Sequence, residues 1–143
     1  MNLAYLFTEF HGRIGRQTFW SGLMILIVAE IVIHRAVNGM LNERMTAIVD
    51  LAFAYPEFAL LGKRAQDRDL PLLLVGGFLG MSVLMNFLSL IGLAGTAEQP
   101  AAPYMILVLL WLVYAVALLI DLGFRRGTPG PNRHGPDPLQ TPA

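Results

Sequence analysis

Three carboxylates interrupt long apolar stretches of this chain, and they are the residues whose positions most suggest chemistry. Glu30, Asp50 and Glu57 each follow and precede runs of hydrophobic side chains. An ionisable group inside a membrane-spanning segment is costly and is therefore a candidate functional residue by default. A buried carboxyl can bind and release a proton near neutral pH, so such groups suit proton or cation transfer.

The structural alternative is that these three acids are paired with bases. Counted from the ends of the apolar stretches, Glu30 and Asp50 are expected near the outer membrane surface and Glu57 nearer the inner one. Buried charges are normally paired, so pairing is the favoured interpretation. The expected partners are Arg35, Arg44 and His34 for the outer acids, and Arg13, Arg16 and Lys63 for the inner acid.

A second charged group is predicted on one side of the apolar stretches. It consists of Arg13, Arg16, Lys63, Arg64 and Asp67. Such a cluster can bind a lipid headgroup or a protein partner. The favoured interpretation is structural: the two N-terminal arginines anchor a helix end, and residues 63–69 (KRAQDRD) form a polar turn in which Lys63 and Asp67 make an i, i+4 pair.

Four apolar stretches must position these groups. A helix needs roughly 20 residues to cross about 30 Å of hydrocarbon, and the expected spans cover about residues 18–37, 45–62, 70–95 and 102–122. The second is the weakest, because each of its central carboxylates costs roughly 2.5 to 3.5 kcal/mol on the insertion scale.

The predicted fold class is an all-α membrane protein with one domain of four transmembrane helices in residues 1–126. Leu3, Leu6, Phe7 and Phe10 recur at helical spacing, which predicts a short amphipathic helix in the membrane interface before the first span. Residues 127–143 are rich in Pro and Gly and are expected to form an irregular cytoplasmic tail with a disordered tip, and whether this tail folds against the bundle stays open.

The basic residues indicate the orientation of the chain. With four spans, eight of the ten Lys and Arg fall on one side and only Arg35 and Arg44 on the other. Because basic residues stay on the cytoplasmic side, both termini are expected in the cytoplasm.

Composition excludes several classes of function. The ten basic and ten acidic residues cancel, which argues against a nucleic-acid partner. The chain has no cysteine and its three histidines lie in different segments, so no metal is expected. Neither a nucleotide-binding loop nor a hydrolase motif is present, and we therefore expect no cofactor and no enzymatic activity.

Two function classes remain open. The favoured one is a non-enzymatic structural or interaction protein whose partners are membrane lipids, another protein or a second copy of itself. The alternative is a small oligomeric transporter or channel component that uses the three carboxylates. Gly76 and Gly80 permit close helix approach, and Ser82, Asn86 and Ser89 can form interhelical hydrogen bonds. Packing within one bundle is the favoured use of both sets.

Three segments, in this order, resemble a known family. They read FHGRIGRQTFW at residues 10–20, YPEFALLGKRAQD at 55–67 and GTPGPNRHGPDP at 127–138. This combination is similar to the bacterial membrane family catalogued as domain of unknown function 805. One departure is Gln66, where many members have a histidine. The resemblance implies a small multi-pass protein of the bacterial inner membrane, and it implies no established activity.

Overall fold

The computed structural model describes residues 2–37, 40, 43–96 and 98–140, without the side chains of residues 43–45. Within these residues the chain forms five α-helices and one π-helical turn, with no strand beyond two isolated bridges. The elements are α1 (Leu3–Thr8), α2 (Arg16–Val37), α3 (Glu43–Asp67), α4 (Leu72–Leu90), α5 (Ala102–Leu119) and η1 (Ile120–Phe124). The prediction of an all-helical fold is confirmed.

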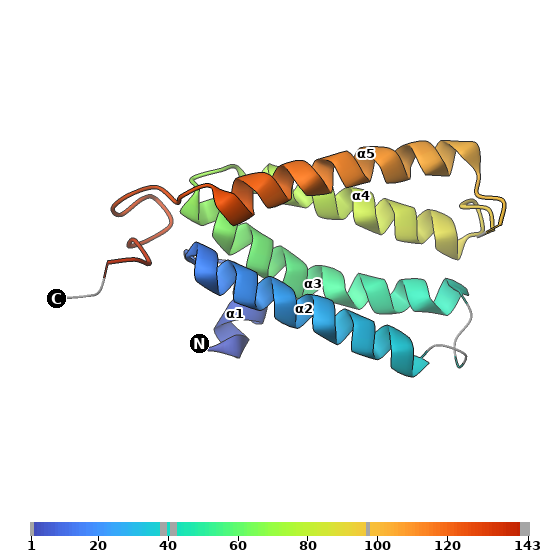
Figure 1. Ribbon diagram of the computed structural model, residues 1–143, viewed down its shortest axis with the longest axis horizontal. Helices are drawn as coiled ribbons and strands as arrows, with labels where there is room; N and C mark the ends of the chain where they lie inside the picture. The colour runs from blue at the N-terminus through green and yellow to red at the C-terminus, as the bar shows by residue number, and fades with distance from the viewer. Residues whose placement is uncertain (1, 38–39, 41–42, 97, 141–143) are drawn as a thin grey trace.

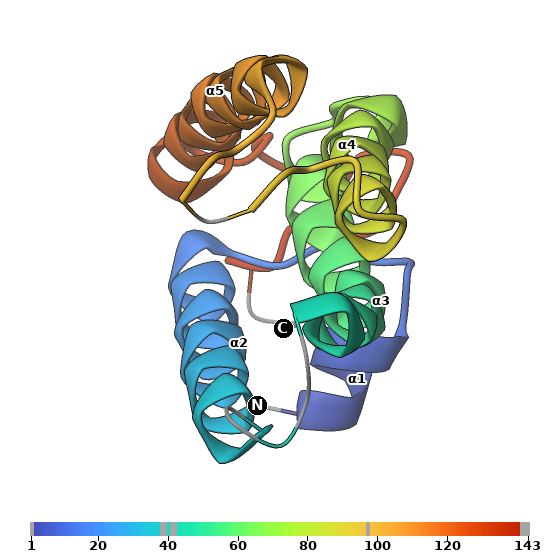
Figure 2. The same ribbon diagram turned by 90° about the vertical axis from the view of Figure 1, so that its right-hand side faces the viewer.

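The four long helices run side by side along one axis (Figure 1). Viewed along that axis, α2 and α3 form one layer, α4 and α5 form the other, and α1 lies beside α3 (Figure 2). The start of α2, the end of α3 and the end of α5 all lie at the end of the bundle where the described chain begins and ends (Figure 1). We call this the terminal end.

The buried apolar core is concentrated towards the terminal end. Its members come from every helix of the described chain. They are Leu6, Ile14, Phe19, Leu26, Leu60, Ala65, Val75, Leu79, Leu118 and Leu122. The charged residues at this end are therefore held by the best-packed part of the molecule.

Helix α1 is short, and its stability depends on contact with the bundle. The side chain of Asn2 accepts a hydrogen bond from the backbone N–H of Tyr5 (3.2 Å) and caps the helix. Leu6 is 1% exposed in the core, whereas Leu3 is 51% exposed. A Cβ added at Gly22 would lie 3.0 Å from a Leu6 methyl group, so the glycine allows α1 to approach α2.

A sharp turn at the C-terminal end of α3 separates it from α4. Asp69 has a φ of 56°, in the left-handed region that aspartate tolerates better than most residues. The backbone N–H groups of Asp69 and Leu70 bond to the carbonyls of Gln66 (3.1 Å) and Ala65 (2.9 Å). This pattern is a Schellman motif, and Pro71 directly after it prevents the helix from continuing.

Among the described residues, three helical segments are long and apolar enough to cross a membrane: Arg16–Val37, Leu72–Leu90 and Ala102–Phe124. They expose large apolar side chains, among them Val32 (59%) and Val113 (69%), as a lipid-facing surface does. Helix α3 is longer, at 25 residues, but its charged residues set it apart from these three segments. Helix α4 ends at Leu90, whereas the sequence predicts a span to about residue 95.

The prediction of a polar turn over residues 63–69 is wrong for its first five residues. Lys63 to Asp67 continue α3, and the residues Lys63, Arg64, Gln66 and Asp67 are at most 2% exposed. A run of charged residues usually marks a solvated loop. Here the N-terminal segment and the tail cover it, so these side chains become part of the interior.

The favoured use of the glycines in α4 is also wrong. A Cβ added at Gly76 or Gly80 would meet no atom within 4 Å, so neither residue packs against another described helix. Of the polar residues of α4 predicted to form interhelical hydrogen bonds, Ser82 does so within the bundle. Trp111 of α5 donates its indole N–H to Ser82 Oγ (2.7 Å).

Candidate functional site

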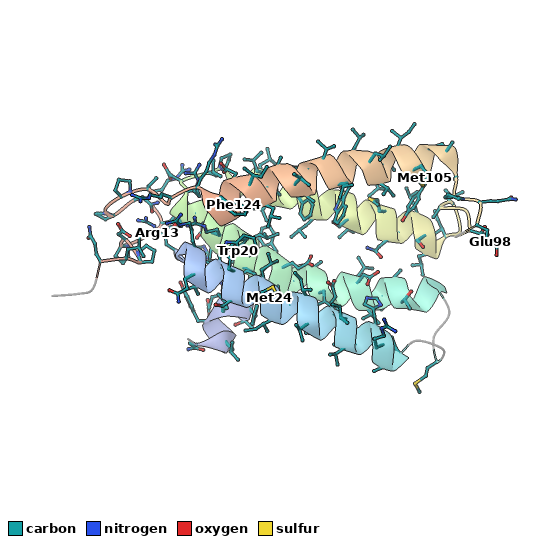
Figure 3. The ribbon with its side chains drawn as sticks, in the orientation of Figure 1. Arg13, Trp20, Met24, Glu98, Met105 and Phe124 are labelled. Carbon is teal, nitrogen blue, oxygen red and sulfur yellow. The ribbon has the colours of Figure 1, made fainter. Side chains whose placement is uncertain are left out.

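The buried charges at the terminal end gather around one carboxylate. Asp67 is 2% exposed. Its Oδ1 accepts a hydrogen bond from Arg13 Nε (3.0 Å), and its Oδ2 accepts one from Arg64 Nη1. Both arginine side chains are 1% exposed. We call these three residues the Asp67 cluster. Figure 3 shows Arg13 where the tail meets the start of α2.

Arg64 uses its other donors on backbone carbonyls. Nε donates to Leu122 O (2.6 Å), Nη2 to Arg125 O (2.6 Å) and Nη1 also to Ile14 O (3.3 Å). The last carbonyls of a helix lack intrahelical partners and carry partial negative charge, which suits a cation. Burial lowers the pKa of the Arg64 guanidinium while Asp67 opposes that shift, and an arginine stays protonated at neutral pH in either case.

Arg13 binds the tail in the same way. Its Nη2 donates to Thr128 O (2.6 Å), and its Nη1 donates to Gly130 O (2.7 Å) and Gly135 O (3.2 Å). The guanidinium of Arg13 therefore joins the carboxylate of Asp67 to three carbonyls of the tail. One carboxylate and six carbonyl groups surround the two buried cations.

The tail also contacts the end of α3 directly. Thr128 donates its backbone N–H (2.8 Å) and its hydroxyl (3.0 Å) to Asp67 O. Asn132 Nδ2 donates to Gln66 O (2.9 Å). A Cβ added at Gly127 would lie 2.1 Å from Asp67 Oδ2, so only glycine fits at this position. The tail thus lies against the bundle, while its tip at residues 141–143 falls outside the described part of the chain.

Two further buried side chains of α3 hold the N-terminal segment. Lys63 Nζ donates to Tyr5 O (2.9 Å) and Glu9 O, and it lies 5.1 Å from the centroid of the Tyr5 ring. Burial lowers the pKa of Lys63 to about 8, with the Glu9 carboxylate acting in the opposite direction. Gln66 Nε2 donates to Phe10 O (2.8 Å). Gln66 was not among the site residues predicted from the sequence, where it was noted only as a departure from the pattern of the family that the chain resembles.

The structure brings together Arg13, Arg64 and Asp67 of the five residues predicted for this cluster. The predicted pair between Lys63 and Asp67 is not formed, because the lysine contacts backbone carbonyls and the aspartate is taken by the two arginines. Arg16 is exposed and is not part of this buried cluster.

An outer set of ion pairs surrounds the end of the last helix. Asp121 Oδ1 lies 2.9 Å from Arg125 Nη1, an i, i+4 ion pair with the acid first. The same oxygen lies 3.0 Å from Arg68 Nη2. Arg68 Nη1 also donates to Arg126 O (2.6 Å), which places the backbone of Arg126 beside the Asp67 cluster.

An open groove with a volume of about 1230 Å³ lies next to the Asp67 cluster. Its walls come from α1, the start of α2, the residues after η1 and the tail. Arg16 and Arg126 are exposed residues of these walls. Arg16 Nη1 donates to Phe124 O (3.2 Å), whereas the Arg126 side chain makes no hydrogen bond or ion pair within the described residues.

The three predicted intramembrane acids line one cavity of about 560 Å³ between the two helix layers. Asp50 Oδ1 lies 2.7 Å from His34 Nε2. Within the described residues, Glu30 and Glu57 form no ion pair, and Arg13, Arg16 and Lys63 contact other groups. The Arg44 side chain lies outside the described part of the chain.

The opposite wall of this cavity carries polar residues of α4. Ser82 and Asn86 line it, together with Trp111 of α5. Asp50 and these three residues also line a second cavity of about 290 Å³, so the two cavities adjoin. Among the described residues, no group of three or more His, Cys, Asp or Glu is placed to hold a metal ion.

Comparison with known proteins identifies the family. The model of the family described as protein of unknown function (DUF805) matches residues 7–136. The chain belongs to the DUF805 family. The match includes every residue of the Asp67 cluster and most of the tail that it binds.

DUF805 relatives include the uncharacterized protein YiiR of Escherichia coli K12 and that of Escherichia coli O157:H7. Each is 30% identical to this chain over 143 residues, covering 96% of this chain and 90% of the relative. No solved structure matches the chain. The DUF805 match therefore gives a family of unknown function and assigns no activity to the site, while the helices apolar enough to cross a membrane are a finding from the structure.

Proposed function

We propose that this protein is a non-enzymatic, four-span protein of the bacterial inner membrane whose terminal end is an interaction surface in the cytoplasm. In this proposal the Asp67 cluster fastens the N-terminal segment and the tail onto the bundle. The fastened segments then face lipid headgroups or a protein partner. The observation that carries the proposal is the joint burial of Arg13, Asp67 and Arg64 against carbonyls of the tail and of the last helix.

The arrangement of the helices supports four crossings. Helix α3 has 25 residues, which at 1.5 Å per residue is about 37 Å and long enough for a bilayer. Its acids do not need to face lipid, because Asp50 contacts His34 and Glu57 lines the cavity between the layers. The start of α2 and the end of α5 lie at the same end of the bundle (Figure 1), as an even number of crossings requires.

Cysteine labelling tests this topology directly. The chain has no cysteine, so single variants can be labelled without background. In cells with a permeabilised outer membrane, we expect a membrane-impermeant maleimide to label Glu98→Cys, which lies at the end opposite the termini (Figure 3). Glu9→Cys and Gln140→Cys should react only after lysis. Three crossings would instead place Glu9 and Gln140 on opposite sides, and labelling of one of them alone would refute the proposal.

The interaction role is tested by releasing the tail. A Thr128→Val variant loses the hydroxyl bond to Asp67 O, and Asn132→Leu loses the bond to Gln66 O. We expect the double variant to keep its helices and to expose the tail to trypsin at Arg133. If the tail presents an interaction surface, in-cell cross-links formed at Gln140→Cys in the wild-type background should disappear in this variant. Unchanged cross-links would mean that the docked tail does not present the surface.

The cavity between the layers supports a second candidate, a transporter or channel component that moves protons or cations. Such a protein needs at least one acid that faces a cavity without a basic partner. Glu57 meets this condition within the described residues. Purified protein in liposomes should then show a proton or cation flux that Glu57→Gln abolishes and Glu9→Gln leaves unchanged. Equal, background-level flux in all three proteins would exclude this candidate.

A further inference from the structure

The groove beside the Asp67 cluster has an excess of positive charge. Four arginines and two aspartates line it. Arg13 and Arg64 already donate to Asp67 and to backbone carbonyls. The second aspartate, Asp137, accepts backbone N–H groups from Gly130 (2.9 Å) and Leu139 (3.0 Å), which lower its pKa and keep it ionised. The remaining two arginines are available to a ligand.

Those two arginines retain most of their donors. Arg16 uses one Nη1 donor on Phe124 O, and its Nε and Nη2 groups have no partner among the described residues. The side chain of Arg126 has no hydrogen-bond or ion-pair partner within the described residues, while its carbonyl is held by Arg68. Each guanidinium can present two parallel N–H groups, the geometry that matches two oxygens of a phosphate.

The start of α2 adds donors to the same wall. Arg16, Gln17 and Thr18 form the first turn of this 22-residue helix and line the groove. The first N–H groups of a helix have no intrahelical acceptor and carry partial positive charge, and this first turn contains no acidic residue to occupy them. The helix start therefore supports the anion preference that the two arginines establish.

The rim of the groove is apolar. Phe124 is 62% exposed and Leu139 is 82% exposed, and both line the groove. Trp20 also lines the groove, its ring packs edge-on against Phe124 with the centroids 5.5 Å apart, and its indole N–H donates to Gly123 O (3.1 Å). A soluble phosphate ester would gain nothing from these apolar side chains, whereas a phospholipid places acyl chains next to its phosphate.

We propose that this groove binds an anionic phospholipid of the cytoplasmic leaflet, with Arg16 and Arg126 as the phosphate ligands and Phe124 and Leu139 against the upper part of the acyl chains. This proposal rests on the proposed function, because it needs the terminal end to lie at the membrane surface. Of the cluster predicted from the sequence to contact lipid, the proposal keeps Arg16 and replaces the buried Arg13 and Arg64 with the exposed Arg126.

Trp20 is a built-in reporter for this site. The chain has two tryptophans, so Trp111→Phe leaves Trp20 alone. We would place this protein in phosphatidylcholine vesicles that contain a fixed fraction of either brominated phosphatidylglycerol or brominated phosphatidylcholine, with bromine near the headgroup. We expect brominated phosphatidylglycerol to quench Trp20 more strongly. A basic residue near an anionic membrane contributes about 1 kcal/mol, so each arginine should contribute about a fivefold preference.

Two variants separate the site from general charge. Arg126→Gln removes a side chain without partners in the described chain, so it tests the site without disturbing the fold, and it should reduce the preference about fivefold. Arg16→Gln with Arg126→Gln should abolish it. Arg133→Gln is the matched control, because Arg133 pairs with Asp69 (2.7 Å) away from the groove, and it should keep the wild-type preference.

The outcomes that overturn the proposal are distinct. Equal quenching by both lipids in the wild type, or a preference that survives the double variant, would exclude the site. Loss of the preference on addition of soluble glycerol phosphate would mean that the groove recognises free phosphate esters. Failure of the proposed topology would appear separately, as altered cysteine labelling at Glu9→Cys and Gln140→Cys.

Discussion

Replacing Asp67 with asparagine should cause the largest loss of stability of any single charge change at the terminal end. The substitution keeps the shape of the side chain and removes the carboxylate that binds two guanidiniums, both of them 1% exposed. Breaking a buried pair by removing one partner usually costs about 3 to 5 kcal/mol, because the other charge is left uncompensated. Two cations are left here, so the upper part of that range is expected.

Thermal unfolding of the purified protein measures this loss. For a chain of this length, a change of that size corresponds to a fall in Tm on the order of 10 °C. The carbonyls of Thr128, Gly130 and Gly135 would still accept from Arg13, but the tail would lose its anchor to the carboxylate. Trypsin should therefore cut at Arg133 faster in the Asp67→Asn variant than in the wild type.

Asp69→Asn is the matched control for Asp67→Asn. It lies two residues further along, makes the same chemical change, and belongs to an ion pair whose side chains are 63% and 45% exposed. Exposed pairs contribute about 0 to 1 kcal/mol, and asparagine tolerates the left-handed conformation found at this position. If the two variants had similar Tm values and similar trypsin sensitivity, the Asp67 cluster would not be the element that holds the terminal end together.

Three smaller changes follow from the same geometry. Gly127→Ala places a methyl group 2.1 Å from Asp67 Oδ2 and should lower stability by about 1 to 3 kcal/mol in thermal unfolding, whereas Gly76→Ala meets no atom within 4 Å and should have little effect. Leu6→Ala removes a core side chain that is 1% exposed and should cost about 2 to 5 kcal/mol, with earlier proteolysis of the N-terminal segment. The folded-state pKa of Lys63 is about 8, below the ordinary value of 10.5, so the unfolded chain binds more protons in that window and stability should rise with pH across it. Lys63→Met should lack this rise, and a parallel pH dependence of Tm in both proteins would contradict it.

The sequence predicts the long helices well because their evidence is local. Continuous apolar runs such as residues 102–119 require no knowledge of distant partners. The end of α3 behaves differently. Whether Lys63 to Asp67 form a solvated turn or a buried helix end depends on the N-terminal segment and on the tail, which lie more than fifty residues away in the chain. A high density of charged residues in the sequence predicts an exposed segment, but here tertiary contacts bury it.

The candidate site was predicted in part for the same reason. Arg13, Arg64 and Asp67 could be grouped because the expected spans bring their segments to one side of the membrane. The partners of Asp67 could not be predicted from residue spacing. The i, i+4 rule favours Lys63, whereas in the structure Asp67 pairs with Arg64 at i, i+3 and with the distant Arg13. The direction in which Gly76 faces also depends on how α4 is rotated in the bundle, which residue spacing does not determine.

The four arginines that line the groove divide into two sets with different physical roles. Arg13 and Arg64 donate to Asp67 and to main-chain carbonyls. A ligand that bound these two guanidiniums in place of Asp67 would leave a buried carboxylate unpaired. Arg16 and Arg126 are exposed and keep free donors, so a ligand gains their charge without cost to the fold. Neutralising the first set should therefore unfold the terminal end at any salt concentration. Neutralising the second should leave the fold intact and remove a lipid preference that weakens as salt screens it.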